Sequence, residues 1–131
     1  AGLPLKRLRV LVPGAGFGHD AIAWAMHGHE VTAVDFAPSA VAGLTLRAKD
    51  AGVAVLVLEA DLFRLPATLD GAFDLVWEQT CYCAVAPARR AEYVEVMARV
   101  LRPGGRLQLA DIVVGSELSE GIRNDIDLWT G

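Results

Sequence analysis

The fold of this chain follows from one stretch of sequence, Leu11-Val12-Pro13-Gly14-Ala15-Gly16-Phe17-Gly18-His19-Asp20. The stretch joins a predicted strand over Leu8–Val12 to a predicted helix over His19–His27. In such a turn the first glycine permits a tight bend, and the second leaves the main chain open to a ligand. The third lets the helix start close to the strand. The stretch therefore predicts a parallel α/β fold with a ligand site at the turn.

Outward from this turn, short aliphatic runs alternate with amphipathic helical segments. Five strands are predicted, at Leu8–Val12, Glu30–Val34, Val53–Leu58, Phe73–Trp77 and Arg106–Val114. Further helices are predicted from Pro38 to Asp50 and after Pro87. This alternation gives right-handed βαβ units. We therefore expect an α/β fold built on a doubly wound parallel sheet.

The amino-acid composition is typical of a folded protein. Of 131 residues, 53% are hydrophobic and 21% are charged, which excludes a disordered tail. We expect a single domain over 1–131, with its core in 8–114 and an acidic tail in 115–131. The net charge of −4 argues against a nucleic-acid partner, which needs a basic face. No apolar run exceeds six residues, so we expect no membrane span. The start lacks a signal-peptide layout, which predicts a cytoplasmic protein.

Two aspartates extend the predicted site. Asp35 ends the second strand, 21 residues after Gly14, where a carboxylate can accept both hydroxyls of a ribose. The alternative is that Asp35 only caps the turn before Pro38. Asp61 follows the third strand and can accept a hydrogen bond from an adenine amino group, or it is a solvated loop residue. Because the carboxyl ends of parallel strands meet at one edge of a sheet, we expect one site.

The spacing of the glycines indicates which class of ligand the turn binds. A dinucleotide fingerprint, G-x-G-x-x-G, would place its third glycine at position 19, which here is His19. The actual spacing is G-x-G-x-G. It disfavours a pyrophosphate cradle and favours a ligand whose adenosine and amino-acid halves bend around the loop.

The order of these motifs resembles class I S-adenosylmethionine-dependent methyltransferases. The matching motifs are the glycine turn, Asp35, Asp61, Phe73-Asp74-Leu75-Val76-Trp77 and Leu101-Arg102-Pro103-Gly104-Gly105. The stretches at 12–20 and 77–90 are similar, more specifically, to the thiopurine, thiol/halide and tellurite methyltransferase group. The segments 109–114 and 123–129 resemble the arsenite methyltransferase branch instead.

The resemblance implies a cofactor and its contacts. The cofactor is S-adenosyl-L-methionine, which leaves as S-adenosyl-L-homocysteine, and the acceptor is a small soft nucleophile, a thiol or a metalloid. The implied binding residues are Gly14, Ala15, Gly16 and Gly18 at the methionine part, Asp35 at the ribose, Phe36, Asp61 and Leu62 around the adenine, and Gln79 near the methionine end. Val12 departs from the class, which usually carries an acidic residue there. This removes one carboxylate that could meet the amino group of the cofactor.

The implied reaction needs few catalytic groups from the protein. Methyl transfer from a sulfonium is an in-line displacement that needs alignment and exclusion of water. Glu78 is the nearest proton acceptor, but a strand-end carboxylate that fixes the next loop is an equal interpretation, so no catalytic residue is assigned. Arg89 and Arg90 are disfavoured by the helix dipole, which points to an anionic partner, although a solvated surface pair is the simpler interpretation.

Cysteines and histidines predict no metal site. Cys81 and Cys83 are one residue apart and no third cysteine exists, which falls short of a closed zinc site. Two thiolates can hold a metalloid, but we favour packing in the core. His27 and His29 flank Gly28 at a helix end, where we expect both at the surface.

Methyltransferases of this class usually end in an antiparallel hairpin and carry an N-terminal helical cover. We expect both to be missing. The resemblance then implies a truncated Rossmann-like sheet with strand order 3-2-1-4-5. This order leaves the fifth strand (107–114) on an edge and favours a homodimer through that edge. Two other function classes stay open. One is a non-catalytic S-adenosylmethionine- or nucleotide-binding domain. The other is an NAD-binding oxidoreductase, which the missing third glycine disfavours.

Overall fold

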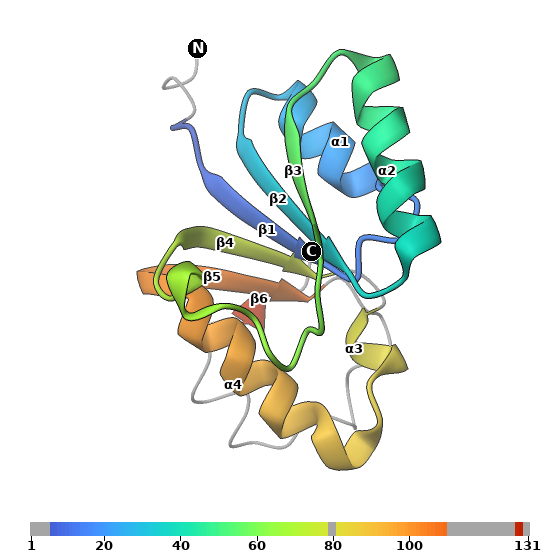
Figure 1. Ribbon diagram of the computed structural model, residues 1–131. Coiled ribbons are helices and arrows are strands. Elements are labelled where there is room, and N and C mark those ends of the chain that lie inside the picture. Colours follow the sequence, from blue (N-terminus) through green and yellow to red (C-terminus); the bar gives the residue numbers. More distant parts are fainter. Residues whose placement is uncertain (1–5, 79–80, 110–127, 130–131) are drawn as a thin grey trace.

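The computed structural model describes residues 6–78, 81–109 and 128–129. Within these residues, one sheet has the order β3-β2-β1-β4-β5-β6, and every neighbouring pair is parallel (Figure 1). The strands are β1 (Arg9–Pro13), β2 (Glu30–Asp35), β3 (Val55–Glu59), β4 (Phe73–Glu78), β5 (Leu101–Leu109) and β6 (Leu128–Trp129). The predicted Rossmann-like doubly wound sheet and its order 3-2-1-4-5 are confirmed.

Helices cover both faces of the sheet. α1 (His19–Met26) and α2 (Pro38–Ala51) lie on one face, and α4 (Arg90–Val100) lies on the other (Figure 1). Pro38 opens α2, as predicted. Three shorter elements are η1 (Ala67–Leu69), α3 (Cys81–Ala84) and η2 (Pro87–Arg89). In the described ranges, none of the helices combines the length and apolar character that crossing a bilayer requires.

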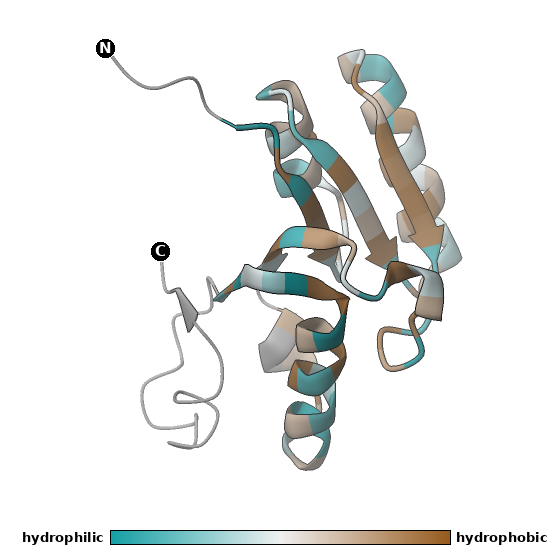
Figure 2. Cartoon of the chain, turned by 90° about the vertical axis from the view of Figure 1, so that its left-hand side faces the viewer, coloured by the Kyte–Doolittle hydropathy of each residue, from teal (hydrophilic) through white to brown (hydrophobic). Residues whose placement is uncertain are grey.

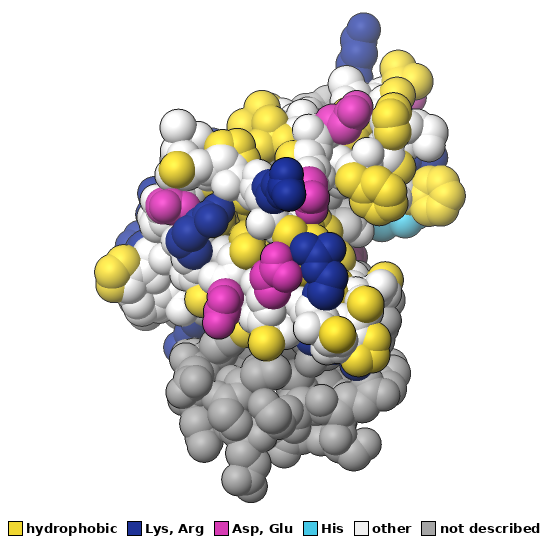
Figure 3. All heavy atoms as spheres, turned by 60° about the horizontal axis from the view of Figure 1, so that its bottom comes forward, with side chains coloured by type: hydrophobic (Ala, Val, Ile, Leu, Met, Phe, Trp, Pro, Cys, Tyr) yellow, Lys and Arg dark blue, Asp and Glu magenta, His cyan; other side chains and the backbone are white. Residues whose placement is uncertain are grey.

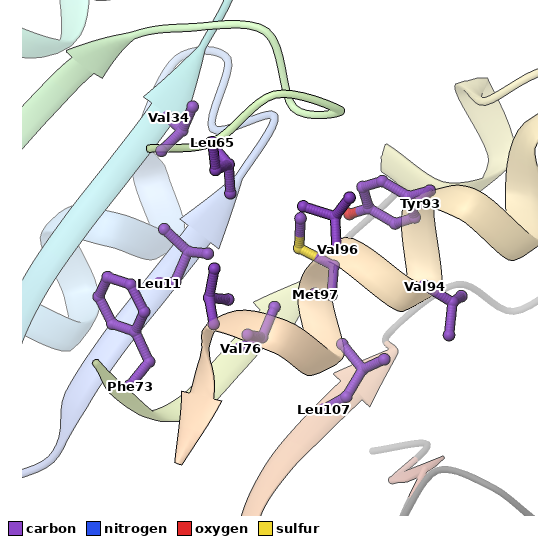
Figure 4. Packing of buried hydrophobic residues seen from close by; sticks show 11 residues of the cluster. Leu11, Val34, Leu65, Phe73, Val76, Tyr93, Val94, Val96, Met97 and Leu107 are labelled. Carbon is purple, nitrogen blue, oxygen red and sulfur yellow. The ribbon is translucent and has the colours of Figure 1, made fainter. Parts of the chain in front are cut away.

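Two hydrophobic clusters join these layers, one on each face. Side chains alternate across a strand, so Leu11 of β1 faces α4 whereas Val10 and Val12 face α1 and α2. In Figure 2 the strands are hydrophobic over much of their length, as expected for a sheet buried on both faces. Figure 4 shows the α4 side, where Leu11, Val76 and Leu107 lie opposite Tyr93, Val96 and Met97. This packing fixes the edge of the sheet at which the strands end.

The fifth strand starts earlier than predicted. β5 begins at Leu101 and not at Arg106. Leu101 pairs with Phe73 and Arg106 pairs with Leu75, so residues 102–105 bulge out of the ladder. Sequence reasoning took the Pro-Gly-Gly run in this bulge as the end of the preceding helix, which ends earlier, at Val100. The predicted part beyond 109 lies outside the described residues.

The prediction that the fifth strand forms an open edge is wrong at two positions. Leu107 pairs with Leu128, and Gln108 pairs with Trp129. An edge strand offers unpaired backbone N–H and C=O groups to any other strand. Here β6 of the same chain takes that place. The homodimer predicted through this edge loses part of its physical basis.

His29 is also placed differently from the prediction. It is buried, its Nδ1 accepts the backbone N–H of Leu8 at 3.0 Å, and its ring packs edge-on against Trp24. The surface position expected from the adjacent Gly28 holds for His27, which is exposed.

Candidate functional site

A cavity of about 670 Å³ opens where β1, β2 and β3 end. Its lining includes five of the residues predicted to contact a cofactor, namely Gly14, Asp35, Phe36, Asp61 and Leu62. Figure 3 shows the molecule from the end toward which these strands run, where acidic and basic side chains stand among hydrophobic ones. Ligands of open α/β sheets bind at this end of the strands. The structure thus brings these five residues to one place.

The glycine turn forms one wall of the cavity. Gly18 has a φ of +83°, and a Cβ there would lie 1.9 Å from Cδ1 of the buried Leu44, so only glycine lets the start of α1 pack against α2. A Cβ on Gly16 would meet no atom within 4 Å, which leaves the main chain open to a ligand. Ala15, Gly16 and Gly18 line a smaller hollow of about 350 Å³, which shares Gly14 with the main cavity.

Asp35 ties the end of β2 to the glycine turn. Its Oδ2 accepts the backbone N–H of Gly16 at 3.0 Å, and its Oδ1 accepts that of Ala37 at 3.0 Å. The bond to Ala37 caps the turn before Pro38, which is the alternative role that the sequence suggested for Asp35. A carboxylate has about four acceptor sites, so about two remain for the hydroxyls of a ligand. The cap and a ligand contact are therefore compatible.

Asp61 and Leu62 extend the cavity away from the glycine turn. The backbone N–H of Ala60 donates to the carbonyl of Asp35 at 3.1 Å, which sets the loop after β3 beside the end of β2. Oδ1 of Asp61 accepts the N–H of Phe63 at 2.9 Å, in a local turn that holds the exposed carboxylate at the cavity.

The wall opposite Asp61 comes from the segment after β4. Cys81 is half-buried, and its Sγ lies 2.7 Å from where a Cβ on Gly14 would stand. Cys81 packs against the hydrophobic core, as predicted, and it also lines the cavity, which was not predicted. The side chain of Cys83 and all of Gln79 lie outside the described part of the chain.

Arg89 is exposed and Arg90 is half-buried, so the solvated pair that we favoured from the sequence holds only for Arg89, and both side chains have partners. The guanidinium of Arg89 lies 3.6 Å above the centre of the Phe63 ring. Nε of Arg90 donates to the carbonyl of Val85 at 3.1 Å. Arg89, Phe63 and Val85 all line the cavity.

Two contacts that hold the glycine turn were missed by sequence reasoning. Arg47 of α2 donates from Nη1 to the carbonyl of Phe17 at 3.2 Å, and its guanidinium lies 5.0 Å from the Phe17 ring. Trp77 of β4 donates from Nε1 to Oδ2 of Asp20 at 3.1 Å. The carboxylate in the first helical turn after the glycines was the available signal for the second contact.

Glu78 does not line the cavity, and its side chain is completely buried. This position at the end of β4 favours the interpretation that Glu78 fixes the neighbouring structure. No group of three or more His, Cys, Asp or Glu side chains in the described ranges could hold a metal ion.

The opposite end of the sheet carries a different cluster. Asp74 is buried and accepts from Arg9, through the backbone N–H at 2.8 Å and through Nε at 3.3 Å, and from Nε of Arg102 at 2.5 Å. The hydrogen bond from the Arg9 side chain is the largest cause that holds the pKa of Asp74 well below its ordinary value, against the opposing effect of burial. A shallow hollow of about 850 Å³ at this end is larger than the site cavity, but it contains none of the predicted site residues.

Three known proteins resemble this chain over most of its length. It is 34% identical over 102 residues to a probable thiol methyltransferase 2 of Arabidopsis thaliana, which covers 76% of this chain and 44% of that protein. It is 32% identical over 109 residues to thiocyanate methyltransferase 1 of the same plant, covering 82% and 46%. A solved structure of Burkholderia thailandensis 1,6-didemethyltoxoflavin-N1-methyltransferase with bound S-adenosylhomocysteine has a TM-score of 0.67 at 28% identity, covering 78% of this chain and 44% of that one.

The fold and the site thus define a Rossmann-like domain of the kind found in S-adenosylmethionine-dependent methyltransferases. The family described as Thiopurine S-methyltransferase matches residues 3–114, and the chain belongs to that family. The chain spans less than half the length of the two Arabidopsis proteins. The segments that resemble the arsenite branch lie almost entirely outside the described residues.

Proposed function

We propose that this chain binds S-adenosyl-L-methionine and forms the methyl-transferring core of an enzyme that methylates a small soft nucleophile, a thiol or a metalloid. One observation carries the proposal. The glycine turn and two carboxylates, Asp35 and Asp61, from the ends of three neighbouring parallel strands surround one cavity. The names of the relatives support a thiol-like acceptor.

The cavity fits the proposed cofactor residue by residue. Gly14, Gly16, Ala15 and Gly18 would hold the methionine part with backbone groups, since the space in front of Gly16 is open. Asp35 would bind the ribose hydroxyls with its remaining acceptor sites. Phe36 and Leu62 would flank the adenine, and Asp61 would accept from its amino group. Gln79 stays a prediction, because it lies outside the described residues.

The proposed reaction needs positioning more than acid–base chemistry. The bound cofactor supplies a methyl group already activated by the positive charge of its sulfur. The protein would orient the acceptor in line with that methyl group and exclude water. A thiol loses its proton to solvent, because its pKa of about 8.5 lies near physiological pH. We therefore assign no catalytic residue.

Calorimetry tests the binding half of the proposal. The chain should bind S-adenosylmethionine and S-adenosylhomocysteine and should not bind NAD. Binding of NAD alone would favour the oxidoreductase interpretation and overturn ours. A thiol reagent gives a second readout, since Cys81 lines the cavity and should react more slowly when S-adenosylhomocysteine is bound.

Turnover tests the catalytic half. A panel of small thiols, thiocyanate and arsenite, with S-adenosylhomocysteine release as the readout, should reveal at least one methyl acceptor. Tight cofactor binding without turnover on any acceptor would favour the non-catalytic binding domain instead.

We propose a small-molecule acceptor, no nucleic-acid partner, a cytoplasmic location and a homodimer. The net charge of −4 supports the absence of a nucleic-acid partner. The homodimer keeps weaker support, because β6 occupies the edge of β5 at Leu107 and Gln108. Sedimentation velocity at micromolar concentration and neutral pH decides it, and a monomer contradicts it.

A further inference from the structure

Arg89 and Phe63 form a stacked pair at one end of the site cavity. The guanidinium carbon of Arg89, in η2, lies 3.6 Å from the centre of the Phe63 ring, which follows β3. Both residues line the cavity. A distance this short places the planar guanidinium directly over the ring, as in a cation–π contact.

A carboxylate fixes the orientation of this guanidinium. Glu92 accepts from Nε of Arg89 at 3.3 Å and from Nη2 at 3.2 Å, which is a two-point contact. Phe63 therefore occupies one face of the guanidinium and Glu92 occupies one edge. The Nη1 group lies outside this ion pair. Glu92 lies three residues further along the chain, whereas Phe63 comes from the distant loop after β3.

The ion pair adds little to stability. The side chains of Arg89 and Glu92 are each 51% exposed, and ion pairs this exposed contribute about 0 to 1 kcal/mol. A cation immediately before α4 also meets the positive end of the helix dipole. A long side chain ordered for so little gain in stability points to a role in the cavity that it lines.

The order of contacts along the cavity shows which part of a ligand would meet Arg89. The glycine turn is bonded to Asp35 through Gly16, and the loop after β3 is bonded to Asp35 through Ala60. Phe63 is bonded in turn to Asp61. A ligand with its amino-acid part at the glycines and its ribose at Asp35 therefore directs its base toward Phe63 and the stacked arginine.

We infer that Arg89 is a specificity-determining residue that contacts the purine base of the adenosyl ligand and closes the far end of the cavity with its planar guanidinium. The inference rests on the proposed binding of S-adenosylmethionine. A flat cation prestacked on Phe63 offers an aromatic base a second stacking surface and a donor edge. A flexible or neutral side chain at this position offers neither.

The test compares three variants by calorimetry with S-adenosylhomocysteine. Arg89→Met keeps the aliphatic stem, and Arg89→Lys keeps the charge without the plane. Arg64→Met is the matched control, because Arg64 is an exposed arginine next to Phe63 that does not line the cavity. We expect both Arg89 variants to raise the Kd about three- to tenfold, and the control to leave it unchanged. Thermal unfolding checks that all three variants fold alike.

A base-altered ligand makes the test specific. S-inosylhomocysteine differs from S-adenosylhomocysteine only in its purine, and we expect Arg89→Met to change the ratio of the two Kd values. An unchanged Kd and an unchanged ratio in Arg89→Met would overturn the role of Arg89. Failure of the unaltered chain to bind S-adenosylhomocysteine would instead overturn the proposed function, so the two failures are distinguishable.

Discussion

Two aspartates at opposite ends of the sheet show how one residue type serves two purposes. Asp35, at the carboxyl end of β2, is half-buried and accepts two neutral backbone N–H groups. Asp74, at the amino end of β4, is buried and bound by the arginines Arg9 and Arg102. Asp35 lines the cavity of the proposed site, whereas Asp74 joins β1, β4 and β5.

The difference lies in what saturates each carboxylate. Charged donors on Asp74 give strong bonds and a depressed pKa, and they leave little capacity for a ligand. Neutral donors on Asp35 position the carboxylate but leave acceptor sites open. We therefore expect changes at Asp74 to affect stability and changes at Asp35 to affect ligand binding.

The largest effect is expected for Asp74→Asn. The substitution removes the negative charge that two arginines share, and we expect the free energy of unfolding to fall by about 3 kcal/mol. The side chains of Arg9 and Arg102 are 44% and 39% exposed, and solvent reduces the cost of leaving them without the carboxylate. Urea unfolding followed by circular dichroism measures it. Glu92→Gln, in an exposed pair, is the control, and equal losses in the two variants would remove the distinction between the ends of the sheet.

Alanine substitutions at Gly18 and Gly16 compare the packing of two glycines at the site end of the sheet. Gly18→Ala would place a methyl group 1.9 Å from Cδ1 of Leu44 at a φ of +83°. We expect a loss of about 2 to 3 kcal/mol in unfolding free energy, from strain and overpacking together. Gly16→Ala also has a positive φ, but its Cβ points into open space, so about 1 kcal/mol is expected. If the two variants unfold at the same urea concentration, the packing argument for Gly18 fails.

Asp35→Ala should act on the ligand more than on the fold. Loss of the bonds to ribose hydroxyls should weaken the binding of S-adenosylhomocysteine by about 1 to 3 kcal/mol, or roughly 5- to 150-fold in Kd. Calorimetry measures the change, with Asp50→Ala on the exposed end of α2 as the control. An unaltered Kd would take Asp35 out of the site.

The smallest effect is the acid dependence of stability. The folded pKa of Asp74 is depressed, so its contribution is complete above its unfolded pKa of about 4 and is lost as the pH falls toward the folded pKa. Between pH 5 and pH 3 this single group should remove about 1 kcal/mol of unfolding free energy. Subtracting the pH profile of the unfolding free energy of Asp74→Asn from that of the parent chain isolates the contribution of Asp74. Parallel pH profiles for the two proteins would contradict the assignment.

Local sequence signals predicted the fold well. Apolar runs separated by helical segments predicted five strands of a parallel sheet, because each signal lies within a few residues of the element that it marks. Strand ends then placed Gly14, Asp35 and Asp61 together, since parallel strands share one carboxyl edge. Residues that depend on distant partners were missed. His29 is buried by contacts to Leu8 and Trp24, and no property of its own neighbours in the sequence indicates this.

The sequence alone determined the parallel sheet and the glycine turn, because periodicity and short motifs are properties of neighbouring residues. Its motifs also carried the resemblance to a methyltransferase family, which the family match confirmed. Only the tertiary structure decided that Arg89 stacks on Phe63, that Trp77 bonds Asp20, and that β6 pairs with β5. Each of these contacts joins segments at least 18 residues apart in the chain. Their geometry depends on how the helices pack on the sheet, and local sequence does not record that packing.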